Sequence, residues 1–227
     1  VTLSLPEIAF GINRIYPFKR KKPTGSAKWY ESINVTYSMN LRNELNTYDS
    51  LVFDKDVANR FVNGVKHSIP FTGSFKVFKY FSWSNSVNYT ERWYSKTINK
   101  TWMDDTIVSG GVTKYGYIDI DTISGFKTAR DYSFNSSLST TIYGMKQFRR
   151  GPIRAIRHVV RPSVGFSYLP DFGREDLGYW KTVQTDSKGS TALYSIFEGN
   201  SISGAPPSQK SGAINFSLSN NLEMKVR

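Results

Sequence analysis

Residues 214–227 read INFSLSNNLEMKVR, and this segment decides the fold. Its even-numbered positions are apolar except Asn220, and its odd-numbered positions are all polar or charged. A period of two places the apolar side chains on one face of a β-strand and the polar ones on the other. The run exceeds the five or six residues of an ordinary strand and covers the roughly 9 to 11 tilted residues that cross a bilayer. The segment therefore predicts a membrane-spanning strand.

The same alternation recurs along the chain. It is regular in residues 33–42 and 132–142, and less regular in residues 69–77, 112–120 and 158–168. Pro6 marks a slip, since the apolar positions change from odd to even across it and proline has no ladder N–H, so we expect a β-bulge there. The pattern predicts an all-β fold, an antiparallel transmembrane β-barrel.

The size of the barrel segment follows from the length of the chain. In 227 residues there is room for about ten barrel strands. We therefore expect residues 1–227 to be part of one outer-membrane β-barrel domain without an internal boundary, a segment of a larger barrel. Because the alternating pattern is already present at Val1 and no signal peptide precedes it, the chain is interpreted as a piece of a longer precursor.

Composition excludes several classes of protein. No apolar run approaches the roughly 18 to 20 residues of a transmembrane helix. The mean hydropathy of −0.42 still fits a barrel, because only every second strand residue faces lipid. With no cysteine in the chain, disulfides, thiolate nucleophiles and thiolate metal sites are excluded.

The connections between the expected strands are of two kinds. A short turn is expected at Gly110-Gly111, and a short helix within residues 54–65. Long polar connections are expected over residues 19–28, 43–65, 93–109 and 172–210. Short turns on one side and long loops on the other are typical of bacterial outer-membrane barrels.

Candidate catalytic residues are few and scattered. His67 and His158 are far apart in sequence and each lies within a strand pattern, so both are interpreted as ordinary strand residues. The acidic pairs Asp104-Asp105 and Glu175-Asp176, with Asp119 and Asp121, could serve calcium binding or acid–base catalysis, but solvated loop charges explain them more simply. We therefore expect no enzyme activity, no metal and no cofactor.

Basic residues exceed acidic ones, 30 against 18, for a net charge of +12. This excess implies an anionic partner. Two clusters follow aromatic residues, as at a membrane interface where rings lie at headgroup level and cations meet phosphates. The alternative for the first cluster is a solvated loop tip. Nucleic-acid binding is disfavoured because the aromatics do not gather on one stacking platform. The candidate anionic-lipid contacts are Lys19, Arg20, Lys21 and Lys22, and Arg149, Arg150 and Arg154.

The polar side of the alternation supplies candidate lumen residues. Hydroxyl and amide side chains there would line a wet interior that accommodates a polar saccharide. These candidates are Asn34, Thr36, Ser38, Asn135, Ser137, Ser139, Asn215, Ser217 and Ser219.

Residues 157–172, RHVVRPSVGFSYLPDF, resemble the mid-barrel segment of the outer-membrane lipopolysaccharide-assembly family called LptD or OstA. The positions that carry the resemblance are Arg157, His158, Pro162, Tyr168 and Pro170. Residues 194–199 and the strand from Ala213 onward are similar to the next loop and strand of that family. Residues 5–8, 16–20 and 29–30 resemble Bacteroidetes-type members.

The resemblance implies lipopolysaccharide transport at the outer membrane of a Gram-negative bacterium. It also implies lipopolysaccharide, a plug lipoprotein like LptE and a periplasmic bridge protein as partners. Two other functions remain open from the residues alone. One is a porin-like, TonB-linked or secretion channel, and the other is a secreted β-sandwich that binds glycans.

Overall fold

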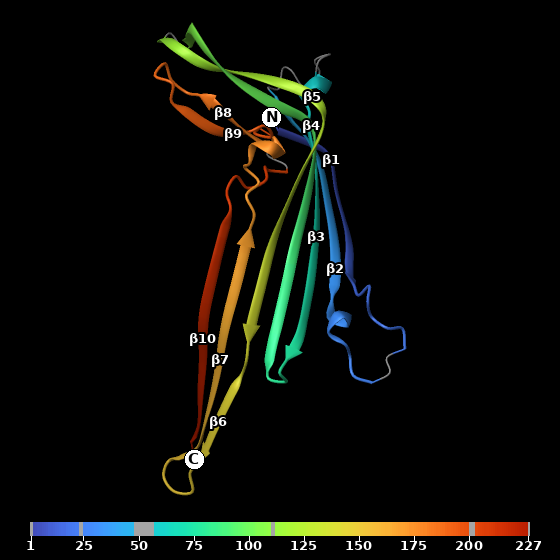
Figure 1. Ribbon diagram of the computed structural model, residues 1–227, viewed down its shortest axis with the longest axis vertical. Helices are drawn as coiled ribbons and strands as arrows, with labels where there is room; N and C mark the ends of the chain where they lie inside the picture. The colour runs from blue at the N-terminus through green and yellow to red at the C-terminus, as the bar shows by residue number, and fades with distance from the viewer. Residues whose placement is uncertain (1, 23–24, 48–56, 110–111, 200–202, 227) are drawn as a thin grey trace.

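The computed structural model describes residues 2–22, 25–47, 57–109, 112–199 and 203–226. Figure 1 shows long strands side by side, with a small hairpin beside their upper ends. The strands are β1 (Thr2–Ile15), β2 (Asn34–Asn46), β3 (Val62–Val77), β4 (Phe81–Ser109), β5 (Val112–Ser139), β6 (Ile142–Gln147), β7 (Ile153–Leu169), β8 (Trp180–Gln184), β9 (Thr191–Ser195) and β10 (Ser211–Val226). The helical turns are η1 (Trp29–Ser32), α1 (Val57–Arg60) and η3 (Glu175–Leu177).

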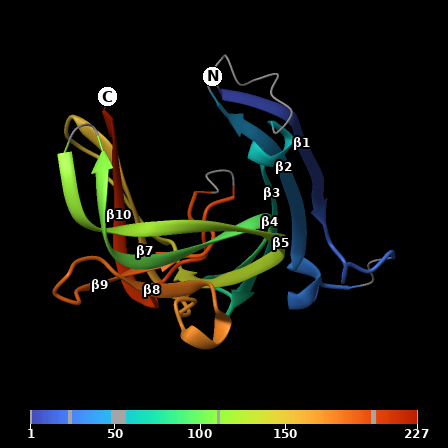
Figure 2. The same ribbon diagram turned by 90° about the horizontal axis from the view of Figure 1, so that it is seen from above.

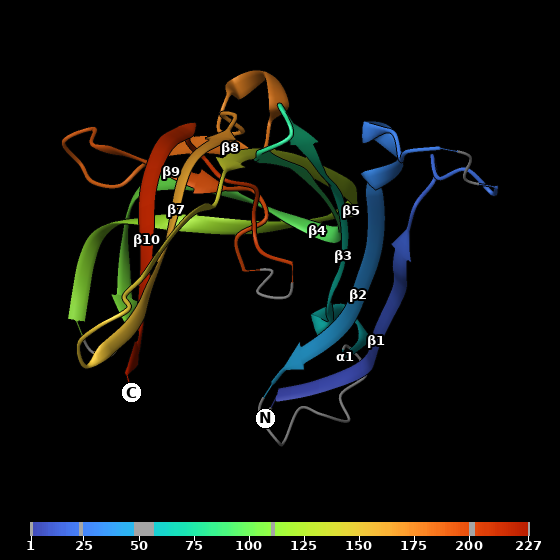
Figure 3. The same ribbon diagram turned by 90° about the horizontal axis from the view of Figure 1, so that it is seen from below.

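The sheet is antiparallel and open. Its strand order is β1-β2-β3-β4-β5-β7-β10, with β6 also paired to β7, while β8 and β9 form a separate hairpin. Figures 2 and 3 show the sheet curved into a trough with β1 and β10 at its edges. The all-β, antiparallel prediction is confirmed. Among the described residues the sheet has eight strands, fewer than the roughly ten expected, and it does not close.

Strand β6 continues β5 in the same register. Leu138 pairs with Val164 and Ile142 with Val160, so β6 and the last residues of β5 form one continuous run beside β7. The break between them falls opposite Pro162. The Thr140 N–H donates to the Pro162 carbonyl at 3.2 Å, but proline has no N–H to return the bond. A missing donor therefore interrupts the ladder.

The register separates the two faces of the sheet. One row across four strands holds Ser84, Ser137, Gly165 and Asn215. The adjacent row on the opposite face holds Trp83, Leu138, Val164 and Phe216. The alternation that we read from the sequence thus becomes one polar face and one apolar face, and the apolar side chains are substantially exposed.

The slip at Pro6 is confirmed as a bulge. The pairing of β1 with β2 shifts between Ser4 and Glu7, whose partners Glu44 and Arg42 are two residues apart. Helix α1 lies within the segment where a short helix was expected, whereas Gly110-Gly111 and residues 48–56 are outside the described residues.

The prediction of a loop over residues 93–109 is wrong. These residues belong to β4, which pairs with β5 up to Ser109 and Val112. Register shifts between Tyr94 and Lys96 and between Met103 and Thr106 interrupt the alternation, which explains why the sequence pattern missed this strand. Threonine and isoleucine are common in the segment, and both favour strands. The long connection expected over residues 43–65 is also shorter, since β2 extends to Asn46 and β3 begins at Val62.

The gap in the ladder at Pro162 can be filled. In Pro162→Val a new N–H faces the Thr140 carbonyl, so β5 and β6 should join into one strand. We expect a gain of about 0.5 to 1.5 kcal/mol, the net value of one hydrogen bond, measured as a higher denaturant midpoint in detergent or bilayer. Val164→Ile, a change on the same face without a new donor, is the control. An unchanged midpoint in Pro162→Val would show that the missing donor does not limit stability.

Candidate functional site

A polar hollow of about 480 Å³ lies on one face of the sheet. Its lining reaches from Arg14 on β1 to Asn215 on β10, so the polar face is the concave side of the trough. Between these two ends the polar lining residues include Asn34, Thr72, Ser74, Ser84, Ser86, Asn135, Ser137 and Ser167. Of the described residues that line the hollow, Arg14 alone carries a charge.

Hydroxyl and amide groups on this face bond mainly across strands. The Thr72 hydroxyl donates to Asn34 Oδ1 at 2.8 Å, and the Ser163 and Ser217 hydroxyls lie 2.6 Å apart. These groups both donate and accept hydrogen bonds. Because these groups are neutral, their interstrand hydrogen bonds can be replaced by hydrogen bonds to water or to sugar hydroxyls without leaving a charge unpaired.

The described residues of the connection between β7 and β10, 170–199 and 203–210, pack against the same face at the upper end of the trough. Tyr94 of β4 and Ala129 of β5 are buried beneath Phe197 of this connection. The rings of Tyr94 and Phe197 stack with centroids 4.1 Å apart. The backbone N–H of Ile98 donates to the Ile196 carbonyl at 2.8 Å. The connection is therefore docked onto the sheet.

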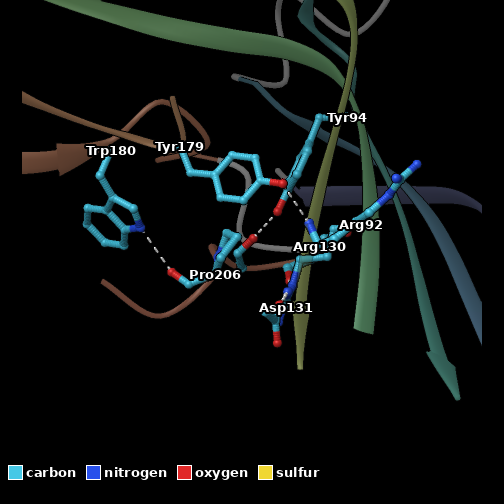
Figure 4. Close-up of polar contacts among 9 residues, drawn as sticks. Arg92, Tyr94, Arg130, Asp131, Tyr179, Trp180 and Pro206 are labelled. Carbon is cyan, nitrogen blue, oxygen red and sulfur yellow. Dashed lines mark hydrogen bonds and ion pairs between the residues drawn. The ribbon is translucent and has the colours of Figure 1, made fainter. Parts of the chain in front are cut away.

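Polar contacts fasten the connection to the sheet (Figure 4). Arg92 forms an ion pair with Asp131 and donates through Nε to the Ser203 carbonyl at 2.8 Å. Both side chains are about nine-tenths buried, at 10% and 12% exposure. The Tyr94 hydroxyl donates to the Gly204 carbonyl. A buried ion pair with its donors used in this way fixes one geometry.

Two further contacts hold the start of the hairpin. The backbone N–H of Arg130 donates to the Tyr179 hydroxyl at 3.2 Å, and Trp180 Nε1 donates to the Pro206 carbonyl at 3.2 Å (Figure 4). The sequence prediction of a patternless loop over residues 172–210 missed this docking. The available signal was a pair of opposite charges, Arg92 and Asp131, at positions on the polar face of two strands.

The nine candidate lumen residues all lie on the polar face, three each on β2, β5 and β10. Asn34, Asn135, Ser137 and Asn215 line the hollow itself. A continuous row across the sheet joins Asn34 to Asn135 through Thr72 and Ser86. That these residues face a closed lumen stays a prediction.

The two basic clusters lie at the end of the sheet that carries the tight turns (Figure 1). Lys19, Lys21 and Lys22 lie in the connection between β1 and β2, and Arg149 and Arg150 lie in the turn between β6 and β7. Arg154, just within β7, completes the second cluster. The structure thus brings both clusters to one end but does not merge them.

Arg20 has an internal role that the sequence did not indicate. It forms an ion pair with Glu31, with an Nη2–Oε2 distance of 3.1 Å, and Glu31 also accepts from the Lys28 backbone N–H at 2.8 Å. Arg20 and the Lys28 N–H lower the pKa of the Glu31 carboxyl to about 2. This network shapes the connection around η1.

The five residues that carried the family resemblance do not form one site. Arg157, His158, Pro162 and Tyr168 are spread along β7, and Pro170 follows it. Arg157 lies 3.5 Å from Glu223 across the pair with β10, and His158 Nε2 lies 3.2 Å from Asn220 Oδ1. The four residues within β7 are paired with β10 in this structure, and Pro170 lies outside the strand.

The described residues contain no group of three or more histidine and acidic side chains placed to hold a metal ion. His67 is buried, and its Nδ1 lies 2.8 Å from the Tyr37 hydroxyl. Over the same ranges, no helix has the length and apolar character needed to span a membrane.

Comparison with known protein families gives a match over the whole chain. A family model described as LptD protein matches residues 1–227, the whole chain. No curated protein and no solved structure matches the chain.

The buried Arg92–Asp131 pair should control docking of the connection. Arg92→Ala leaves Asp131 buried without its partner, which costs about 3 to 5 kcal/mol. We expect thermolysin to cut within residues 170–199 at least about a hundredfold faster, as followed by mass spectrometry.

Two controls make this result specific. Arg174→Ala removes an exposed pair with Asp176, 59% and 65% exposed, and should change the rate by less than about fivefold. The double variant Arg92→Leu/Asp131→Leu should recover much of the protection, since paired apolar replacement is often neutral. Equal cleavage of Arg92→Ala and the unaltered chain would contradict the assignment.

The Arg20–Glu31 pair should make the η1 connection acid-sensitive. Because the folded pKa of Glu31 is depressed, its stabilising contribution is present above the ordinary value of 4.5 and is lost as the pH falls toward about 2. The cysteine-free chain permits one dye label at Ala27→Cys. We expect its emission to change between about pH 4.5 and 2. Glu31→Gln should abolish the transition, and a transition that survives in this variant would assign it to another group.

Proposed function

Since the chain belongs to the LptD protein family, a transport and assembly family of the Gram-negative outer membrane, we propose that it forms part of the transmembrane β-barrel through which lipopolysaccharide reaches the outer leaflet. The observation that carries this proposal is the two-faced sheet. Its convex face is apolar and exposed, and its concave face is a hollow of hydroxyl and amide groups. A lipid bilayer and a saccharide are the environments that match these faces.

The apolar face has the height of a membrane. On β4, Trp83 and Trp93 lie on this face, ten residues apart. Between them the face carries Asn85, Val87, Tyr89 and Glu91, and Glu91 is paired with Arg130 of β5. At about 3.3 Å per residue the interval is about 33 Å along the strand. With a tilt of about 40° it spans about 25 Å, the height of the apolar band between the aromatic girdles of outer-membrane barrels. Beyond Trp93, β4 and β5 would extend out of the bilayer.

Closure of the sheet is part of the proposal. The outer edges of β1 and β10 carry backbone groups without strand partners among the described residues. Hydrocarbon does not tolerate unpaired N–H and C=O groups, so an open edge in a bilayer must find another strand. We infer that further strands pair with both edges and that residues 1–227 are part of one barrel domain.

The orientation follows from the connections. The β3–β4 and β6–β7 turns are short, whereas the β2–β3 and β7–β10 connections at the opposite end are long. The β1–β2 connection, between Ile15 and Asn34, is a long exception at the end with the short turns. Outer-membrane barrels place short turns in the periplasm and long loops outside. Lipopolysaccharide would then meet the basic end first, where Lys21, Lys22, Arg149 and Arg150 attract its phosphates. The docked β7–β10 connection would narrow the far end of the path.

The proposed partners are lipopolysaccharide, a plug lipoprotein like LptE and a periplasmic bridge protein. The polar hollow supports a lumen that contacts either the saccharide or a plug. The basic end supports delivery of an anionic lipid from the periplasmic side. The reaction is transport, and in this proposal no covalent bond is made or broken.

Photo-cross-linking in cells tests the path. A photoreactive residue at Ser137 or Ser217, both on the polar face, should label lipopolysaccharide during transport. Leu138 and Phe216 are the matched controls, because each follows or precedes its partner by one residue and lies on the apolar face at the same level. We expect labelling at the serine positions to exceed that at the controls about tenfold, since side chains of adjacent residues point to opposite faces.

Two outcomes would count against the proposal. Lipopolysaccharide adducts absent from Ser137, Ser217 and Asn34 in an actively exporting cell would exclude the concave face as its path. Equal labelling on both faces would show contact with bulk lipid and no directed route.

A further inference from the structure

A separate groove of about 580 Å³ lies on the apolar face at the tight-turn end. Its walls include Trp29 of η1, Phe75 of β3, and Trp83 and Val87 of β4. It is on the opposite side of the sheet from the polar hollow. The translocation proposal does not use it.

Three aromatic rings form one wall of the groove. The ring centroids of Trp29 and Phe75 are 5.9 Å apart, and those of Phe75 and Trp83 are 5.3 Å apart. The contact with Phe75 places Trp29 against β3 although it comes from the β1–β2 connection. The groove is therefore built by tertiary contacts and is not a gap between two neighbouring strand residues.

The groove is deepened at Gly73, because this residue has no side chain to fill its base. This residue pairs with Asn85 on the apolar face, so an aromatic or aliphatic side chain is missing at both positions. A Cβ at Gly73 would lie 3.4 Å from Ile33 Cγ1, already within the packed wall. Gly73 thus leaves a recess that a slender apolar ligand can enter.

A second depression adjoins the groove, and its lining contains several cationic side chains. It shares Trp29 and Phe75 with the groove and is also lined by Lys19, Lys28 and Lys76. Glu31 is the acidic residue in its lining, and its charge is matched by Arg20. Among the described residues, the three lysines have no carboxylate within 4.0 Å. The depression therefore has an excess of positive charge directly beside an apolar recess.

We propose that the groove and the depression together bind one anionic glycerophospholipid of the leaflet at the tight-turn end. One acyl chain lies along Trp29, Phe75 and Trp83, and the phosphate lies near Lys19 and Lys28 of the β1–β2 connection. The inference rests on the proposed function in one respect, since it needs the apolar face to be in a bilayer. Aromatic rings at headgroup level and cations reaching phosphate are the matching chemistry.

The dimensions favour a phospholipid over the transported lipid. A volume of about 580 Å³ is in the range of sites for one small ligand, about 300 to 1,000 Å³. The groove opens toward the bilayer, whereas the saccharide-compatible surface is on the concave face. The site would fix one lipid beside η1 and so tie the β1–β2 connection to the membrane.

Tryptophan quenching by brominated lipids tests the site. The full chain is reconstituted in phosphatidylcholine vesicles that contain increasing fractions of brominated phosphatidylglycerol or of brominated phosphatidylcholine. We expect half-maximal quenching at about a fivefold lower fraction of the anionic lipid, the preference that corresponds to about 1 kcal/mol for one lysine near a phosphate.

Substitutions test which residues cause the preference for the anionic lipid. Lys19→Gln/Lys28→Gln should remove the preference and leave quenching by phosphatidylcholine unchanged. Lys188→Gln, in the β8–β9 turn far from the groove, should retain it. Trp29→Phe keeps an aromatic ring next to Phe75 but removes a reporter, so the excess quenching by the anionic lipid should fall.

The outcomes separate this inference from the proposed function. Quenching by neither lipid would show that the tryptophans do not contact a bilayer, which overturns the proposed function and the site together. Equal quenching by both lipids would overturn the site and leave the membrane-embedded sheet intact. Displacement of brominated phosphatidylglycerol by a lower fraction of lipopolysaccharide would assign the groove to the transported lipid and overturn the phospholipid assignment.

Discussion

Interstrand hydrogen bonding in a fixed register is the constraint on which the rest of the structure depends. Side chains alternate with a period of two, so a shift of one residue would exchange the polar and apolar faces of a strand. The row Trp83–Leu138–Val164–Phe216 stays apolar across four strands because three pairings keep the same register. The hollow, the convex face and the groove all follow from that agreement.

The regular hydrogen-bond ladder is interrupted near Pro6, at Pro162, and in the upper parts of β4 and β5. The bulge near Pro6 restores the apolar phase of β1, and Pro162 divides one long strand into β5 and β6 without moving either. The register shifts within β4 and β5 lie above Trp93, outside the proposed bilayer. Irregular pairing there has water to satisfy its backbone groups, which hydrocarbon would not provide.

The sequence predicted the strands best where one face is apolar and the other polar. The alternation alone was enough to predict the strands at Ile214 to Val226 and Tyr132 to Ile142. In both, one face is mainly apolar and the other is polar, so the sequence alternates with a period of two. The sequence-based prediction failed over residues 93–109. Both faces of the strand are polar or mixed there, and bulges shift the alternation from one face to the other. The β3–β4 turn also had no signal, since Phe78 and Lys79 adopt positive φ angles of 48° and 69° in place of glycine or asparagine. The Arg92–Asp131 pair and the Trp29–Phe75 contact depend on tertiary packing, which periodicity does not encode.

The docked β7–β10 connection also sets an order of folding. The bond from Arg92 to Ser203 joins residues 111 positions apart, and the bond from Tyr94 to Gly204 joins residues 110 apart. Contacts of such long sequence separation form late, because the chain between them must first be ordered. Their platform consists of β4 and β5, which pair through a local hairpin. We therefore expect the contacts that cover the upper end of the concave face to form after β4 and β5 have paired.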